Sequence, residues 1–133
     1  MQNSKIIILL VASISLPLLT GCKPGEDKAI ELAKKEIAQN LKDPDSAKFR
    51  FVRMVQSKEN DDGTILALVC GQVNAKNAFG AYAGFKSFMI DISMKSNSIF
   101  NKGVTYKLGH KQISHDGTEN DIPAYQQVCG EDK

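Results

Sequence analysis

A nearly unbroken apolar run at Thr64–Val73 places the strongest constraint on how this chain folds. Its centre has the sequence Ile-Leu-Ala-Leu-Val-Cys, and a strand that is apolar on both faces has to be covered on both sides. The preceding Asp62-Gly63 pair is a hairpin signal, because these residues tolerate positive backbone dihedral angles. We therefore predict that Thr64–Val73 is the central strand of a sheet, with a helix packed on one side.

Three further strands are predicted around this run. The first begins at Lys48, and its apolar residues are Phe49, Phe51, Val52 and Val55. Another spans Phe85–Ser93, where alternate residues (Phe88, Ile90 and Ile92) are apolar, so that one face points inward. A last strand is expected at Ser98–Leu108.

The segment Glu26–Leu41 is predicted to be an amphipathic helix. Apolar residues recur at a spacing of three or four, at Ile30, Ala33, Ile37 and Leu41. The opposite face carries Glu31, Lys34, Lys35 and Gln39. One face of this helix therefore packs on another element.

Asp43-Pro44-Asp45-Ser46 ends this helix, because a proline disfavours helical geometry at the residue before it. Asp43 is expected to cap a single new turn, with Pro44 in its first position. The alternative is that Asp43 and Asp45 act as a general acid and base. Capping and turn formation explain both acids with fewer assumptions.

The first residues have the pattern of an export signal. Met1–Lys5 is polar with one positive charge, and the apolar run Ile6–Leu19 is too short for an ordinary membrane-spanning helix. The end of this stretch, Leu19-Thr20-Gly21-Cys22, resembles the lipobox of bacterial lipoproteins. The alternative is that Cys22 is an ordinary thiol near a membrane anchor.

This resemblance implies a signal peptide at 1–21, a short lipid-anchored tether at 22–25 and a single domain at 26–133. Cys22 would carry a diacylglyceryl thioether, usually with a third acyl chain such as palmitate on its amino group, which is enough for stable anchoring. Lys23 stands where lipoproteins of the inner membrane commonly have aspartate. In a Gram-negative host this favours the outer membrane, facing the periplasm.

Cys70 and Cys129 remain as an even pair in a chain expected in an oxidising compartment, which favours a disulfide. A catalytic thiol and a metal site are weaker alternatives, since no second ligand lies at a useful spacing. Ile122, Tyr125 or Gln126, and Cys129 recur at helical spacing. Asn120 or Asp121 is expected to cap this helix, with Pro123 in its first turn.

Together these elements predict an α+β fold. We expect an N-terminal amphipathic helix packed on an antiparallel sheet of three to five strands, and a short C-terminal helix tied to the sheet by the disulfide.

The segment Gly71–Phe85 contains a mixture of asparagine, lysine, aromatic and glycine residues that folding alone does not fully explain. Its candidate partner-binding residues are Asn74, Lys76, Asn77, Phe79, Tyr82 and Phe85. Aromatic anchors with asparagine and glycine are typical of a recognition loop. The alternative is a long hairpin with Phe79 and Tyr82 packed on the sheet edge and the glycines forming turns, and it is slightly favoured.

The segments 43–50 (DPDSAKFR) and 69–77 (VCGQVNAKN), continuing to Phe85, resemble a pattern shared by small uncharacterised bacterial and phage-encoded proteins. The likeness covers roughly the first half of the chain that follows the predicted signal peptide. It supports the fold as a unit and implies no activity.

Other functional classes find little support in the sequence. The 17 basic and 15 acidic residues are spread along the chain, which gives no reason to expect nucleic acid as a partner. His110 and His115 match no compact metal-ligand pattern and are interpreted as surface residues. No phosphate-binding loop or nucleophile elbow is present, so we expect neither an enzyme nor a cofactor beyond the lipid on Cys22.

The sequence therefore predicts a membrane-anchored envelope protein that binds an envelope protein or a cell-wall component. Within that class an inhibitor or immunity-like role is favoured by analogy. The alternatives are a structural accessory of an envelope or secretion assembly and a cell-wall hydrolase that uses Asp43 and Asp45.

Overall fold

The computed structural model describes residues 23–97, 103–115 and 122–133. Within these residues the elements, in chain order, are α1 (Glu26–Ala38), the 3-10 turn η1 (Pro44–Ser46), β1 (Lys48–Glu59), β2 (Ile65–Asn74), β3 (Lys86–Ser96), β4 (Val104–Ile113) and α2 (Tyr125–Cys129). The strands form one antiparallel sheet in the order β1-β2-β3-β4. The predicted combination of helix and antiparallel sheet is confirmed. The expected leader and Cys22 lie outside the described residues.

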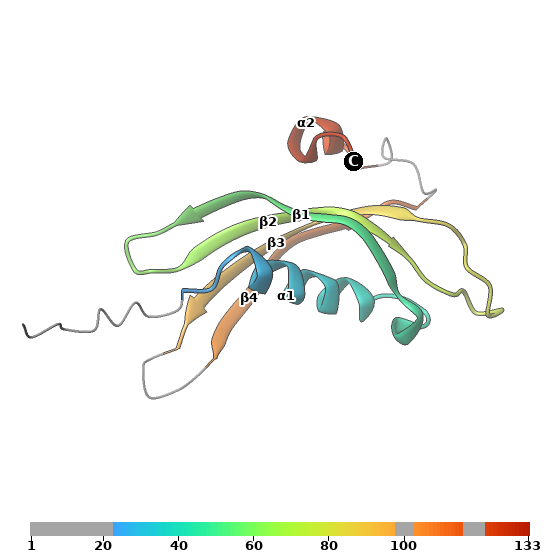
Figure 1. Ribbon diagram of the computed structural model, residues 1–133, viewed down its shortest axis with the longest axis horizontal. Helices are drawn as coiled ribbons and strands as arrows, with labels where there is room; N and C mark the ends of the chain where they lie inside the picture. Colours follow the sequence, from blue (N-terminus) through green and yellow to red (C-terminus); the bar gives the residue numbers. More distant parts are fainter. Residues whose placement is uncertain (1–22, 98–102, 116–121) are drawn as a thin grey trace, which may run out of the picture.

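The two helices lie on opposite faces of the sheet (Figure 1). On the α1 side, β2 contributes Ala67, Val69 and Val73 to a core that also holds Phe88, Ile90, Ile92 and Met94 of β3. On the α2 side, β2 contributes Leu68 and Cys70 to a smaller cluster. Alternate residues of one strand therefore fill two cores, which confirms the predicted strand with two apolar faces. In the described part of the chain no helix is long and apolar enough to cross a membrane.

Helix α1 begins where it was predicted but ends three residues early. Its buried residues are Ala29, Leu32, Ala33 and Ile37, while Ile30 and Leu41 pack against the core only in part. After Ala38 the backbone tightens, because the N–H groups of Asn40 and Leu41 donate to carbonyls three residues back, at 3.1 and 3.0 Å. In the whole chain α1 follows 25 residues, so it is not N-terminal. Helix α2 is only five residues long.

The predicted hairpin between β1 and β2 is confirmed. Gly63 has a φ of 77°, and its N–H donates to the carbonyl of Asn60 at 2.9 Å. The Asp62 carboxylate accepts from the backbone and hydroxyl of Thr64, at 3.0 and 2.8 Å, and from Lys95 Nζ at 3.0 Å. The Asp62 side chain therefore ties this hairpin to β3.

The last strand lies further along the chain than predicted. It was expected at Ser98–Leu108, of which residues 98–102 lie outside the described part, but β4 runs from Val104 to Ile113. Ile113 pairs with Phe88, so the ladder continues well past Leu108. β4 is an edge strand with many exposed polar residues, and its second half therefore lacks the apolar alternation that marks a strand.

Strand β1 is irregular, with shifts in its register at Arg50/Arg53 and at Met54/Gln56. Phe51 lies at the first shift with a φ of 54°. A Cβ atom on the facing Gly71 would lie 2.9 Å from Val52 Cγ2 and 3.0 Å from Val52 Cα. Glycine at 71 therefore allows the bulged part of β1 to pack closely on β2.

The predicted disulfide is confirmed. Cys70 on β2 and Cys129 at the end of α2 are bonded, with their Cα atoms 5.9 Å apart. Ile122, Tyr125 and Cys129 are buried together. The helix starts later than predicted, because Pro123 lies in the turn before α2 and not in its first turn. The proposed caps Asn120 and Asp121 lie outside the described residues.

Candidate functional site

The candidate recognition segment divides between β2 and a loop. Gly71–Asn74 belongs to β2, and residues 75–85 connect it to β3. An isolated bridge joins Lys76 to Tyr82, and the N–H of Asn77 donates to the carbonyl of Ala81 at 2.8 Å. We call residues 75–85 the β2–β3 loop. Its base is thus held by backbone pairing.

The two asparagines of the candidate site hold the loop in shape. Asn77 Oδ1 accepts from the N–H groups of Phe79 and Ala81, at 2.9 and 3.2 Å. Asn74 Oδ1 accepts from the N–H of Gly84 at 3.1 Å. These side chains satisfy backbone donors in turns, which is the usual role of asparagine. The glycines also serve turns: Gly80 and Gly84 have φ values of 79° and 102°.

Phe79 and Tyr82 have different environments, although both are exposed, at 95% and 40%. Phe79 is 95% exposed at the tip of the loop. The Tyr82 hydroxyl donates to the carbonyl of Ser46, the last residue of η1, at 3.1 Å. Ser46 Oγ also accepts from the N–H of Lys76 at 2.8 Å. The turn at 44–46 thus supports the loop, while Phe79 projects into solvent.

Cations surround the aromatic rings of this region. Lys48 Nζ lies 4.3 Å and Lys76 Nζ 5.9 Å from the centre of the Tyr82 ring. The Arg50 guanidinium carbon lies 3.8 Å from the centre of the Phe85 ring and 5.2 Å from that of Phe51. Lys48 and Arg50 were not among the predicted site residues. Their alternation along the first strand was the signal that could have suggested them.

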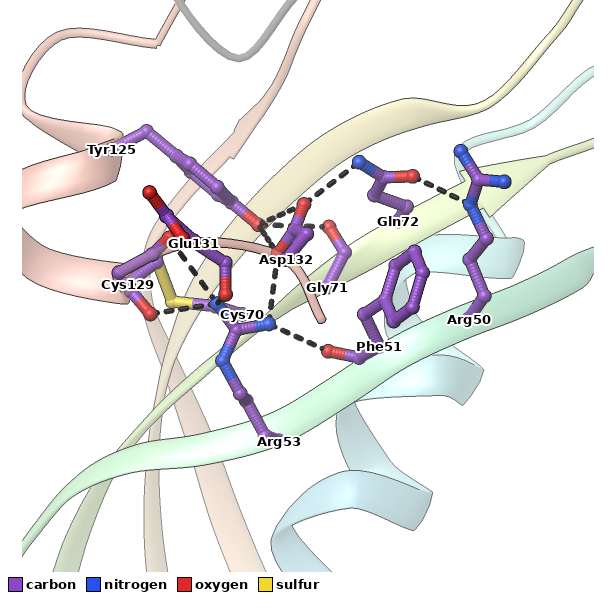
Figure 2. A network of polar contacts seen from close by, with 11 residues as sticks. Arg50, Phe51, Arg53, Cys70, Gly71, Gln72, Tyr125, Cys129, Glu131 and Asp132 are labelled. Carbon is purple, nitrogen blue, oxygen red and sulfur yellow. Dashed lines mark hydrogen bonds and ion pairs between the residues drawn. A yellow bond between two sulfur atoms is a disulfide. The ribbon is translucent and has the colours of Figure 1, made fainter.

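A polar network that the sequence did not indicate extends from Arg50 across the sheet to the C-terminal residues (Figure 2). Arg50 Nε donates to Gln72 Oε1 at 2.6 Å, and Gln72 Nε2 donates to Asp132 Oδ2 at 2.7 Å. Arg53 Nη1 donates to Asp132 Oδ1 at 2.8 Å. The Tyr125 hydroxyl lies 3.2 Å from the same oxygen. The network joins β1 and β2 to α2 and the residues after it.

Arg53 also binds the end of α2. Its Nη2 donates to the carbonyl of Cys129 at 2.7 Å, and the carbonyls of Gly130 and Glu131 lie 3.4 and 3.3 Å away. A cation is favourable there, because the last carbonyls of a helix have no partner within it. Burial raises the pKa of Tyr125 above its usual range, and the Asp132 carboxylate adds to this effect. The Tyr125 hydroxyl also lies 3.3 Å from the carbonyl of Gly71, so it links α2 to β2.

A separate groove of about 830 Å³ lies over the sheet, away from the loop. Its apolar lining includes Leu66, Leu68 and Leu108, and its polar lining includes Lys58 and Asp91. None of the predicted partner-binding residues lines it.

The remaining predicted groups are not brought together. His110 and His115 are both exposed, and within the described ranges no three histidine, cysteine or acidic residues converge as metal ligands would. Asp43 precedes η1 as predicted, but its side chain makes no capping hydrogen bond. Instead its backbone carbonyl accepts from Ser46 Oγ at 2.8 Å, so the capping prediction was wrong in that detail.

The fold and the loop define a small α+β protein with two exposed aromatic residues, Phe79 and Tyr82, on a hydrogen-bonded loop. Comparison of the chain with protein-family models, with curated proteins and with solved structures found no match. Its function is therefore inferred from the residues themselves.

Proposed function

We propose that this protein is a lipid-anchored envelope protein that binds a partner, without catalysing a reaction, through Phe79 and the β2–β3 loop. The observation that carries the proposal is the 95% exposure of Phe79 on a loop whose neighbouring N–H groups are already bonded. Exposed aromatic residues on ordered loops supply a large contact area with little loss of conformational entropy, and they recur at the centres of interfaces.

The position of the loop relative to residue 23 supports this role. Lys23 Nζ lies 2.7 Å from Glu59 Oε1, at the end of β1 beside the β1–β2 hairpin. The β2–β3 loop lies at the opposite end of the sheet (Figure 1). With a lipid on Cys22, the loop faces away from the membrane. In a Gram-negative host it then faces the periplasm, where the Cys70–Cys129 disulfide is stable.

Within this class we favour an inhibitor or immunity-like role, in which the loop blocks a partner protein. The disulfide and the Arg53–Asp132 pair fix α2 on the sheet, while hydrogen bonds fix the loop. A binding surface that is ordered before contact loses less entropy on binding. This choice within the class is made by analogy.

A structural accessory of an envelope or secretion assembly is the alternative role. It would use the outer edge of β4, which no strand of the described residues covers. An open edge can pair with an extended segment of another protein.

Affinity purification from an envelope fraction, with the full chain as bait, tests the loop. Phe79→Ala and the double variant Phe79→Ala/Tyr82→Ala should lose a partner that the parent retains. The matched control is Leu66→Ala/Leu108→Ala, which removes two side chains that are 42% and 41% exposed elsewhere. If the Phe79 variants are folded by circular dichroism and recover the partner as well as the parent does, the loop is not the binding site.

The lipid anchor has its own test. Labelled palmitate should enter the parent chain, and Cys22→Ser should abolish both the labelling and the membrane partitioning. Unchanged processing and partitioning of this variant would overturn the anchor.

A further inference from the structure

Three cations beside the β2–β3 loop have no carboxylate partner within the described residues. They are Lys48, Arg50 and Lys76. The positive charge at the loop is therefore not neutralised within the described residues. Other described cations also lack an ion pair, as Lys35 and Lys107 do, whereas Arg53 and Lys95 pair with Asp132 and Asp62. What distinguishes the three cations at the loop is their contact with aromatic rings.

Aromatic rings hold these cations without cancelling their charge. Tyr82 contacts Lys48 and Lys76, with ring-centre distances of 4.3 and 5.9 Å, and Phe85 stacks on Arg50 at 3.8 Å. Such contacts orient the side chain but leave its N–H groups able to donate. Among the described residues Arg50 donates only from Nε, to Gln72. A guanidinium fixed in this way can bind a carboxylate through its remaining edge.

The spacing of the cations matches an extended chain. Lys48 and Arg50 pair with Asn74 and Gln72, so they alternate on β1 and project from the same face of the strand. Their backbones are roughly 7 Å apart, from the rise of a strand. Acidic side chains at alternate positions of an extended segment have the same spacing.

We propose that the partner presents an acidic, extended segment of protein that binds across these cations, an inference that rests on the proposed function. The surface consists of Lys48, Arg50, Phe51, Lys76, Phe79 and Tyr82, and we call it the cation–aromatic surface. The spacing of Lys48 and Arg50, which matches alternate residues of an extended chain, favours a protein over an anionic polysaccharide. Two rings of this surface are exposed beside these cations, 95% for Phe79 and 37% for Phe51. A protein segment supplies apolar side chains for the rings as well as carboxylates for the cations.

Fluorescence anisotropy with labelled probes tests this proposal on the full chain purified in detergent. The first probe is a peptide with glutamate at every second position and serine between, and the second has glutamine in place of glutamate. Heparin, a sulfated polysaccharide, is the third. The glutamate peptide should bind, the glutamine peptide should not, and added salt should weaken binding because exposed charges are screened.

Charge-neutral variants locate the binding. Lys48→Gln/Arg50→Gln should weaken binding of the glutamate peptide roughly fivefold, as expected for the loss of two exposed ion pairs. The control Lys35→Gln/Lys107→Gln removes the same charge from exposed residues on α1 and β4, and it should bind like the parent. An equal loss in the control, equal binding of the glutamine peptide, or a heparin-only response would overturn the proposal.

The two proposals can fail separately. A captured partner that depends on Phe79 but not on Lys48 and Arg50 would refute the acidic segment and leave the loop as a binding site. Glutamate-peptide binding that depends on Lys48 and Arg50, without any Phe79-dependent partner, would refute the proposed function instead.

Discussion

Arg53 Nη1 and Asp132 Oδ1 lie 2.8 Å apart, although the two residues are 79 positions apart in the sequence. The Asp132 side chain is 3% exposed and that of Arg53 is 27% exposed. Gln72 and Tyr125 complete the hydrogen bonds of the carboxylate. This pair, of which the carboxylate is buried, holds α2 and the residues after it on the sheet together with the disulfide.

Asp132→Ala should lower the free energy of unfolding by about 2–3 kcal/mol, because it removes a buried carboxylate that accepts hydrogen bonds from Arg53, Gln72 and Tyr125. Urea denaturation of the parent and the variant measures the difference. Glu131→Ala is the matched control: its pair with Lys133 is largely exposed, at 75% and 81%, so its loss should change stability by less than about 1 kcal/mol. Equal stability of Asp132→Ala and the parent would contradict a stabilising role for the pair.

Stability should fall in alkaline solution because of Tyr125. Burial and the Asp132 carboxylate raise its pKa in the folded state above the ordinary value of 10.0. The folded state therefore holds this proton more tightly than the unfolded state. Its contribution to stability is fully present below pH 10 and is lost as the pH rises above 10. Tyr125→Phe should remove this part of the dependence in denaturation curves recorded across that range. A Tyr125 that ionises at pH 10 in an absorbance titration would speak against it.

Asp62 should titrate with a pKa of about 2, lowered from 3.8 first by its hydrogen bond to Lys95 and then by those to Thr64. The carboxylate interactions stabilise the fold above pH 3.8 and are lost as the pH falls toward 2. Carbon-detected NMR titration measures this pKa directly. In Lys95→Gln the pKa should rise but stay below 3.8, since Thr64 still donates. An unchanged value in this variant would show that Lys95 has no effect.

Gly71→Ala should destabilise the protein by about 1–3 kcal/mol, because the added methyl overlaps Val52 Cα and Phe88 Cζ at 3.0 and 3.1 Å. Thermal unfolding measures the loss. Gly25→Ala is the control, since an added Cβ there meets nothing within 4 Å and the φ is an ordinary −107°. Because Gly25 is the N-cap of α1, where alanine is unfavourable, this variant should lose about 1 kcal/mol or less. If the two variants unfold at the same temperature, the close packing of β1 on Gly71 does not contribute to the stability of the fold.

The predictable parts of the fold are those marked by a pattern within a short stretch of the sequence. The apolar run of β2 and the Asp62-Gly63 turn mark a strand and a hairpin by themselves, and the cysteine pair suggested the disulfide. The second half of β4 lacks such a signal, since its pairing with β3 rather than its own pattern makes it a strand. Helix α1 was placed well, apart from its last turn.

The site was harder to predict, because its contacts join distant residues. Composition identified the β2–β3 loop, but it gave no means to decide that the Tyr82 hydroxyl donates to the carbonyl of Ser46 while Phe79 stays almost fully exposed. Arg53 and Asp132 each look like ordinary surface charges in the sequence. Their burial depends on the position of α2, which follows from the whole fold.

The two register shifts in β1 also affect how copies of this chain can meet. A regular strand added beside β1 would have to match both interruptions and the left-handed Phe51, so the ladder would be broken at that edge. β4, with a single shift, is the edge better suited to pairing. In a dimer joined through β4, the two outer edges of the combined sheet would both be β1 strands with their register shifts. Edge-to-edge growth would then stop at a dimer and would not continue into a fibre.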